Sequence, residues 1–96
     1  MIVRIFGDQQ YRLDDDRHGP LNELDDAVVT AVERGDQAGY RERFDALLAF
    51  VRSNGTPLAD DELIGSDVLL PPDDLTFDEA GREFNGEGLV PDPADA

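Results

Sequence analysis

Two stretches of apolar residues at helical spacing, separated only by Gly35-Asp36, restrict the possible folds of this chain more than any other feature. The first stretch follows Pro20, a residue suited to the first helical position, and the second ends at Asn54-Gly55. The apolar positions are Leu21, Leu24, Ala27, Val28, Ala31 and Val32 in the first, and Tyr40, Phe44, Leu47, Leu48 and Val51 in the second. Gly35 is expected to end the first helix and Asp36 to cap the second. Because the connection is so short, the pattern predicts an antiparallel helical hairpin whose two stripes pack together.

The N-terminal residues predict a β-hairpin. Residues 2–6 are β-branched and aromatic-rich, residues 7–10 contain turn formers, and residues 11–13 form a second short strand. Alternation places Ile2, Arg4 and Phe6 on one face of the first strand and Val3 and Ile5 on the other. Since both faces are partly apolar, one of them is expected to pack on the helices.

The C-terminal half is less regular. Residues 56–75 predict an ordered connector with a short extended segment at 67–70, and Thr76 with Glu79 forms a capping box for a short helix over 77–85. The expected fold is therefore α+β: an N-terminal β-hairpin packed on an antiparallel helical hairpin, with an extended connector and a short C-terminal helix. Residues 1–91 are expected to form a single domain, and residues 92–96 a flexible tail.

The charge of the chain excludes several classes of function. Its 96 residues contain 23 Asp and Glu and 8 basic residues, all of them Arg, for a formal net charge of −15. Such a charge repels nucleic-acid phosphates and anionic lipid headgroups, so we expect no direct binding to either. The chain contains no Cys, which excludes disulfides and thiolate zinc sites, and no apolar run long enough for a membrane span. The expected location is cytoplasmic. An Arg-only, acidic surface suits either a high-salt cytoplasm or a genome that favours Asp and Arg.

No catalytic, metal-binding or cofactor-binding residue is predicted. The acidic clusters Asp14-Asp15-Asp16, Asp60-Asp61-Glu62 and Asp73-Asp74 lack the spacing of a calcium loop, and His18 has no nucleophile signature beside it. The candidate partner-binding residues are instead apolar and lie outside the helical hairpin. They are Val68, Leu69, Leu70, Leu89 and Val90. A small domain has difficulty covering both segments, so one of them is expected to meet a partner unless both fold back over the core.

Several segments in this order resemble the PspA-associated domain (PspAA) of archaeal and actinobacterial phage-shock systems. They are the N-terminal hairpin, Leu21-Asn22-Glu23-Leu24-Asp25, Gly55-Thr56-Pro57-Leu58, Ser66-Asp67-Val68-Leu69-Leu70-Pro71-Pro72 and Gly88-Leu89-Val90-Pro91. The resemblance implies a non-enzymatic partner of phage-shock protein A, a coiled-coil protein that protects membranes under envelope stress. Membrane contact would then be indirect, through that partner, and the family supplies no catalytic or ligand residues to transfer.

Two alternatives remain open at this point. An acidic anti-regulator could bind a DNA-binding protein by imitating phosphates, and its binding would weaken steeply with salt. A divalent-cation-binding module could use the acidic clusters, and would show a saturable transition with calcium or magnesium.

Overall fold

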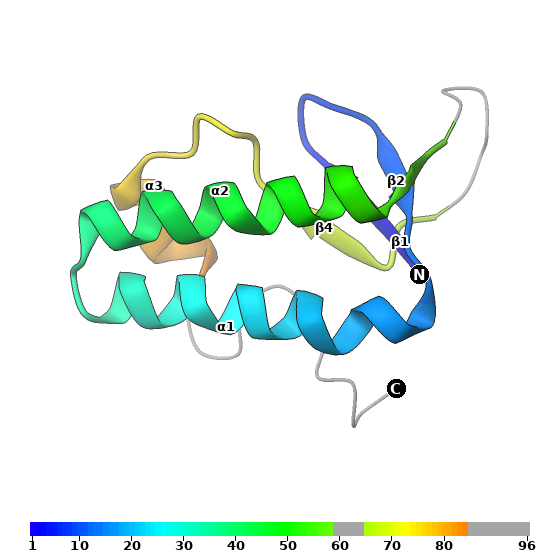
Figure 1. Cartoon of the computed structure of the whole chain (residues 1–96). Coiled ribbons are helices and arrows are strands. Elements are labelled where there is room, and N and C mark those ends of the chain that lie inside the picture. Colours follow the sequence, from blue (N-terminus) through cyan, green and yellow to red (C-terminus); the bar gives the residue numbers. More distant parts are fainter. Residues whose placement is uncertain (59–64, 85–96) are drawn as a thin grey trace.

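The computed structural model describes residues 1–58 and 65–84 and arranges them as a small sheet against a pair of long helices (Figure 1). The elements in chain order are β1 (Ile2–Ile5), β2 (Gln10–Arg12), the 3-10 helix η1 (Asp15–Arg17), α1 (His18–Glu33), α2 (Gln37–Asn54), β3 (Thr56–Pro57), β4 (Val68–Leu70) and α3 (Phe77–Glu83). The α+β class predicted from the sequence is confirmed.

The helical hairpin forms as its periodicity and caps predict. Gly35 adopts φ +70° between the helices, and the Asp36 side chain accepts a 3.0 Å hydrogen bond from the Gly39 N–H at the start of α2. The predicted start of α1 was wrong by two residues, because η1 runs directly into a helix that begins at His18. Pro20 is tolerated there because the first four N–H groups of a helix have no partner within it.

The predicted β-hairpin lies inside a larger, mixed sheet with the strand order β3-β2-β1-β4. Strands β1 and β2 pair antiparallel, with Val3 opposite Tyr11, and β2 also pairs with β3. The extended segment expected at 67–70 is confirmed as β4, which pairs parallel to β1 with Val3 opposite Val68. The sequence did not predict β3, which has two residues, one of them Pro57.

The core lies between the helical hairpin and one face of the sheet. Val3 and Ile5 are fully buried, as are the stripe residues Phe44, Leu47 and Val51 of α2. The face of β1 that contains Val3 and Ile5 is therefore the one that packs on the helices. In Figure 1 the sheet lies against the end of the hairpin where α1 begins and α2 ends, while α3 lies nearer the α1–α2 turn.

Aromatic rings join α3 to the first half of α2. Phe44 packs against Phe84 edge to face, with ring centroids 5.6 Å apart, and Tyr40 lies 5.7 Å from Phe77. The predicted capping box is present, since Thr76 and Glu79 each accept a hydrogen bond from the other's backbone N–H. Helix α3 ends at Glu83, two residues before the predicted boundary. The expected apolar patch at Leu89 and Val90 and the expected tail at 92–96 lie outside the described residues.

Candidate interaction surface

Strand β4 separates the three partner-binding candidates that the structure describes. Val68 and Leu70 are 2% and 0% exposed and belong to the core, whereas Leu69 between them is 50% exposed. This division follows from strand alternation, because β4 has one face toward the helices and the other away from them. For Val68 and Leu70 the expectation of an exposed binding surface is corrected: they fold into the core. Leu69 stays a candidate.

Phe6 joins Leu69 on the outer face of the sheet, the face away from the helices. Leu69 pairs with Arg4, and Phe6 follows two residues later on the same side of the chain. The Phe6 N–H donates a 3.0 Å hydrogen bond to the Leu70 carbonyl, which holds the two chain segments together. Phe6 is 52% exposed, so it and Leu69 are the two large hydrophobic residues exposed in the described part of the chain.

A shallow apolar hollow adjoins this pair. It encloses about 350 Å³ and continues from the sheet onto the segment after β4 and the end of α3. Its lining residues are Phe6, Leu69, Pro71, Pro72, Leu75 and Glu83. Sequence reasoning found Leu69 but not Phe6. Strand alternation places Phe6 on the same face as Ile2 and Arg4, but it does not indicate which face of the strand is exposed.

Two arginines share the outer face with these apolar residues. Arg4 and Arg12 are both exposed, and alternation on β1 and β2 points them away from the buried Val3 and Tyr11. Neither takes part in an ion pair or hydrogen bond with its side chain among residues 1–58 and 65–84. We call Arg4, Phe6, Arg12 and Leu69 the outer-face patch.

A side-chain bridge runs across the same face. The Gln10 amide on β2 donates a 2.7 Å hydrogen bond to Ser66, the residue just before the turn into β4. Because β1 lies between β2 and β4, this bond passes over β1. Ile2, which alternation also assigns to the outer face, is only 7% exposed. Ile2 is therefore not part of the exposed patch, although its partner on β2, Arg12, is.

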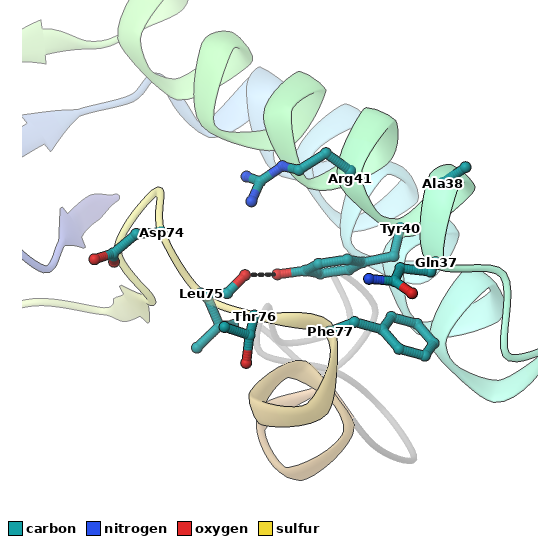
Figure 2. A pocket seen from close by; sticks show the side chains of 8 residues that line it. All are labelled: Gln37, Ala38, Tyr40, Arg41, Asp74, Leu75, Thr76 and Phe77. Carbon is teal, nitrogen blue, oxygen red and sulfur yellow. Dashed lines mark hydrogen bonds between the residues drawn. The ribbon is translucent and has the colours of Figure 1, made fainter.

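A second hollow, of about 610 Å³, lies between the start of α2 and the start of α3 (Figure 2). Its main polar groups already have partners: the Tyr40 hydroxyl donates a 2.6 Å hydrogen bond to the Leu75 carbonyl, and Arg41 pairs with Asp45. Burial raises the pKa of Tyr40, so its hydroxyl stays protonated near neutral pH. The Tyr40 hydrogen bond joins α2 to the segment before α3, and the Arg41–Asp45 pair lies within α2, so both contacts have a structural role.

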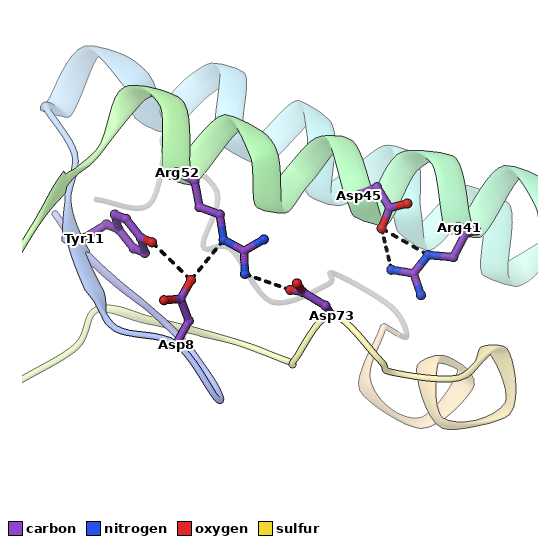
Figure 3. A network of polar contacts seen from close by, with 6 residues as sticks. All are labelled: Asp8, Tyr11, Arg41, Asp45, Arg52 and Asp73. Carbon is purple, nitrogen blue, oxygen red and sulfur yellow. Dashed lines mark hydrogen bonds and ion pairs between the residues drawn. The ribbon is translucent and has the colours of Figure 1, made fainter.

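A polar network next to the apolar hollow ties α2 to the β1–β2 turn and to the segment after β4 (Figure 3). Arg52 on α2 reaches Asp8 in the β1–β2 turn at 3.0 Å and Asp73 after β4 at 2.8 Å. The Tyr11 hydroxyl donates a further hydrogen bond to Asp8. Desolvation acts to raise the pKa of Asp8, but its hydrogen bonds with Arg52 and Tyr11 and the Arg52 charge outweigh it, and that pKa is lowered. The turn that holds Phe6 and the segment that holds Pro72 are thereby tied to one arginine.

Among the described residues, the acidic clusters noted in the sequence do not come together to form a metal site. Within residues 1–58 and 65–84, no three His, Asp or Glu side chains gather closely enough to hold a metal ion. The cluster Asp60-Asp61-Glu62 lies outside these ranges. None of the helices that the structure describes is both long and apolar enough to cross a membrane.

Comparison with known families decides the classification. The family described as PspA-Associated protein matches residues 1–92. The chain belongs to this family. The resemblance noted from the sequence segments is thus confirmed, and it associates the chain with PspA systems. Comparisons with curated proteins and with solved structures gave no match.

The segments that carried the resemblance to the PspA-associated family include several residues that maintain the fold. Leu21 and Asp25 of the Leu-Asn-Glu-Leu-Asp segment are fully buried on α1. The Asp67 carboxylate accepts a 2.7 Å hydrogen bond from the Ile2 N–H and so joins β4 to β1. These residues hold the fold of this chain together, whereas Phe6 and Leu69 are about half exposed and can contact another molecule.

Proposed function

We propose that this chain is a non-enzymatic protein-interaction module whose partner is a PspA-type coiled-coil protein, and that it acts with that partner in the response to envelope stress. The match to the PspA-associated family over residues 1–92 carries the proposal. The proposed location is the cytoplasm, with membrane contact made only through the partner.

The surface of the molecule supports an interaction role. Phe6, just after β1, and Leu69 on β4 are each about half exposed, and exposed apolar groups of this kind favour binding to other proteins. In contrast, the polar groups around the larger hollow are engaged within the molecule: the Tyr40 hydroxyl bonds to the Leu75 carbonyl, and Arg41 pairs with Asp45 within α2. A small domain that keeps an apolar surface uncovered while satisfying its buried polar groups is suited to binding another protein.

The test is recovery of the partner followed by reconstitution. The protein, tagged at its C-terminus, is purified from its own cell lysate in about 2 M KCl, which screens diffuse charge attraction. We expect a PspA-type coiled-coil protein to co-purify, and the two purified proteins to form a complex by size-exclusion chromatography. If the purified pair does not associate, the proposal is wrong. A parallel purification at about 0.1 M KCl tests the anti-regulator. Recovery there of a basic DNA-binding protein, whose binding to the purified chain weakens steeply as salt is raised, would replace the proposal.

A further inference from the structure

We infer that the outer-face patch receives one amphipathic helix of the coiled-coil partner, with the apolar stripe of that helix on Phe6 and Leu69 and its flanking carboxylates on Arg4 and Arg12. This inference rests on the proposed function and specifies the surface and the chemistry of the contact.

The layering of the molecule supports a helix as the occupant. The inner face of the sheet packs on α1 and α2, whereas Arg4, Phe6, Arg12 and Leu69 on the outer face are all exposed. The described elements leave Phe6 and Leu69 about half exposed, and a docked helix would cover them in the way that helices or a second sheet cover the apolar faces of sheets. Amphipathic helices bind such surfaces through apolar residues three and four positions apart.

The charge of the patch selects an acidic helix. The chain has a net charge of −15, yet the outer-face patch contains two arginines without an ion-pair partner in the described residues. Arg guanidinium groups suit carboxylates because they can bind both oxygens at once. Apolar residues flanked by Arg, on a molecule that is otherwise acidic, are complementary to apolar residues flanked by Asp or Glu.

The same charge disfavours a lipid surface. A helix presents its carboxylates locally to Arg4 and Arg12, whereas an anionic bilayer is an extended plane that would also face other parts of a molecule whose net charge is −15. At physiological ionic strength the Debye length is about 8 Å, so acidic side chains within that distance of the bilayer would be repelled by its anionic headgroups. A second copy of this chain would likewise bring another charge of −15 against the first.

The experiment is a titration of the purified PspA-type protein into wild-type and variant chains by isothermal calorimetry. We expect Leu69→Asp and Phe6→Ser each to weaken binding by about 10- to 100-fold, since each removes a large apolar contact. The matched control for the added charge is Ala49→Asp, on the exposed side of α2. Far-UV circular dichroism checks that each variant retains its helicity, and Leu69→Ser replaces Leu69→Asp if that variant fails to fold.

The arginines are tested by the salt dependence of binding. Arg4→Glu with Arg12→Glu is expected to weaken binding by about 10-fold in about 0.1 M KCl and by less than about 3-fold in about 2 M KCl. The control, Arg34→Glu with Arg43→Glu, makes the same change in net charge on the helical hairpin and is expected to change binding by less than about 3-fold at either salt concentration.

Each result distinguishes this inference from the proposed function. If wild type does not bind the PspA-type protein, the proposed function is wrong. If wild type binds and the outer-face variants bind equally well, the partner contacts another surface and only this inference is overturned. Co-sedimentation with phosphatidylglycerol vesicles that depends on Leu69, or a wild-type dimer that Leu69→Asp separates in analytical ultracentrifugation, would also overturn it.

Discussion

The Tyr40 hydroxyl on α2 donates a 2.6 Å hydrogen bond to the backbone carbonyl of Leu75, a residue 35 positions later in the chain. This buried contact fixes the segment before α3 to the first turn of α2. Tyr40→Phe would remove the donor and leave the Leu75 carbonyl without it, so we expect a loss of about 1–3 kcal/mol in the free energy of unfolding. Urea denaturation followed by circular dichroism measures this loss. Tyr11→Phe, which removes a more exposed hydrogen bond to Asp8, is the control and should cost less.

Gly55→Ala should destabilise the protein by crowding. A Cβ at this position would lie 2.6 Å from the Val51 carbonyl oxygen and 2.8 Å from the Tyr11 Cβ, so the backbone where α2 ends would have to move. We expect a loss of about 1–3 kcal/mol, measured by thermal or urea unfolding. Gly81→Ala, on α3 where a Cβ meets nothing within 4 Å, is the control and should be neutral or stabilising. Equal stability of both variants would contradict the close packing at Gly55.

Asp25→Ala should be far more damaging than the same change at the next residue. Asp25 is fully buried on α1, and every buried side-chain polar atom among the described residues has a hydrogen-bond partner. Removing the side chain takes away this hydrogen-bonded contact in the interior, at a cost of about 1–3 kcal/mol or a fall of about 4–20 °C in the melting temperature. Asp26→Ala, on the exposed side of the helix, is expected to shift the melting temperature by no more than about 2–4 °C. A similar response to the two substitutions would show that the buried carboxylate has no stabilising role.

The network of Asp8, Tyr11 and Arg52 should make stability depend on pH. The pKa of Asp8 is lowered from its ordinary value of 3.8, so folding favours the ionised form. The stabilisation from Asp8 is therefore complete well above pH 3.8, begins to fall as the pH drops through that value, and disappears below the lowered pKa of the folded state. We expect wild type to exceed Asp8→Asn in stability at neutral pH, with the difference shrinking at low pH. Urea unfolding of both proteins across this range measures it, and a difference independent of pH would contradict the assignment.

Salt should stabilise the fold as a whole. A net charge of −15 on this small chain produces self-repulsion, and the Debye length falls from about 10 Å at 0.1 M salt to about 3 Å at 1 M. We expect the melting temperature to rise by about 5–10 °C over that range of KCl. Sucrose at matched osmolarity controls for general exclusion effects. A fall in melting temperature would mean that ion pairs such as those of Arg52 outweigh the repulsion.

The parts of the fold that depend on local patterns could be predicted from the sequence. The stripe of α2, the Asp36 cap and the capping box at Thr76 each involve residues within one or two helical turns, so their signals lie side by side in the chain. The pairing of β4 with β1 could not be predicted, because it joins residues about 65 positions apart and leaves no periodic trace. The mixed sheet depends on that pairing and was not predicted. Strand β3 was missed for a separate reason, because it has only two residues and one of them is Pro57.

The candidate interaction surface was also predicted only in part from the sequence. Leu69 was identified together with Val68 and Leu70, because three adjacent apolar residues give no indication of which face will be covered. Only the register with Arg4 places Leu69 outward and its neighbours inward. For the same reason, the sequence placed Phe6 on one face of its strand but did not indicate whether that face would be exposed. The exposed side of a short strand is decided by its tertiary neighbours, not by its own residues.

The parallel pairing of β1 with β4 also has a consequence for biosynthesis. The hydrogen bond from the Ile2 N–H to the Asp67 carboxylate spans 65 residues, a length that a ribosome synthesises in about 3–13 s. During that interval β1 can pair with β2, but the edge that β4 will occupy stays open next to the apolar Val3 and Ile5. Unpaired edges of this kind promote aggregation. The nascent chain is therefore most vulnerable before Leu70 emerges, and a chaperone or an early partner would have most effect in that window.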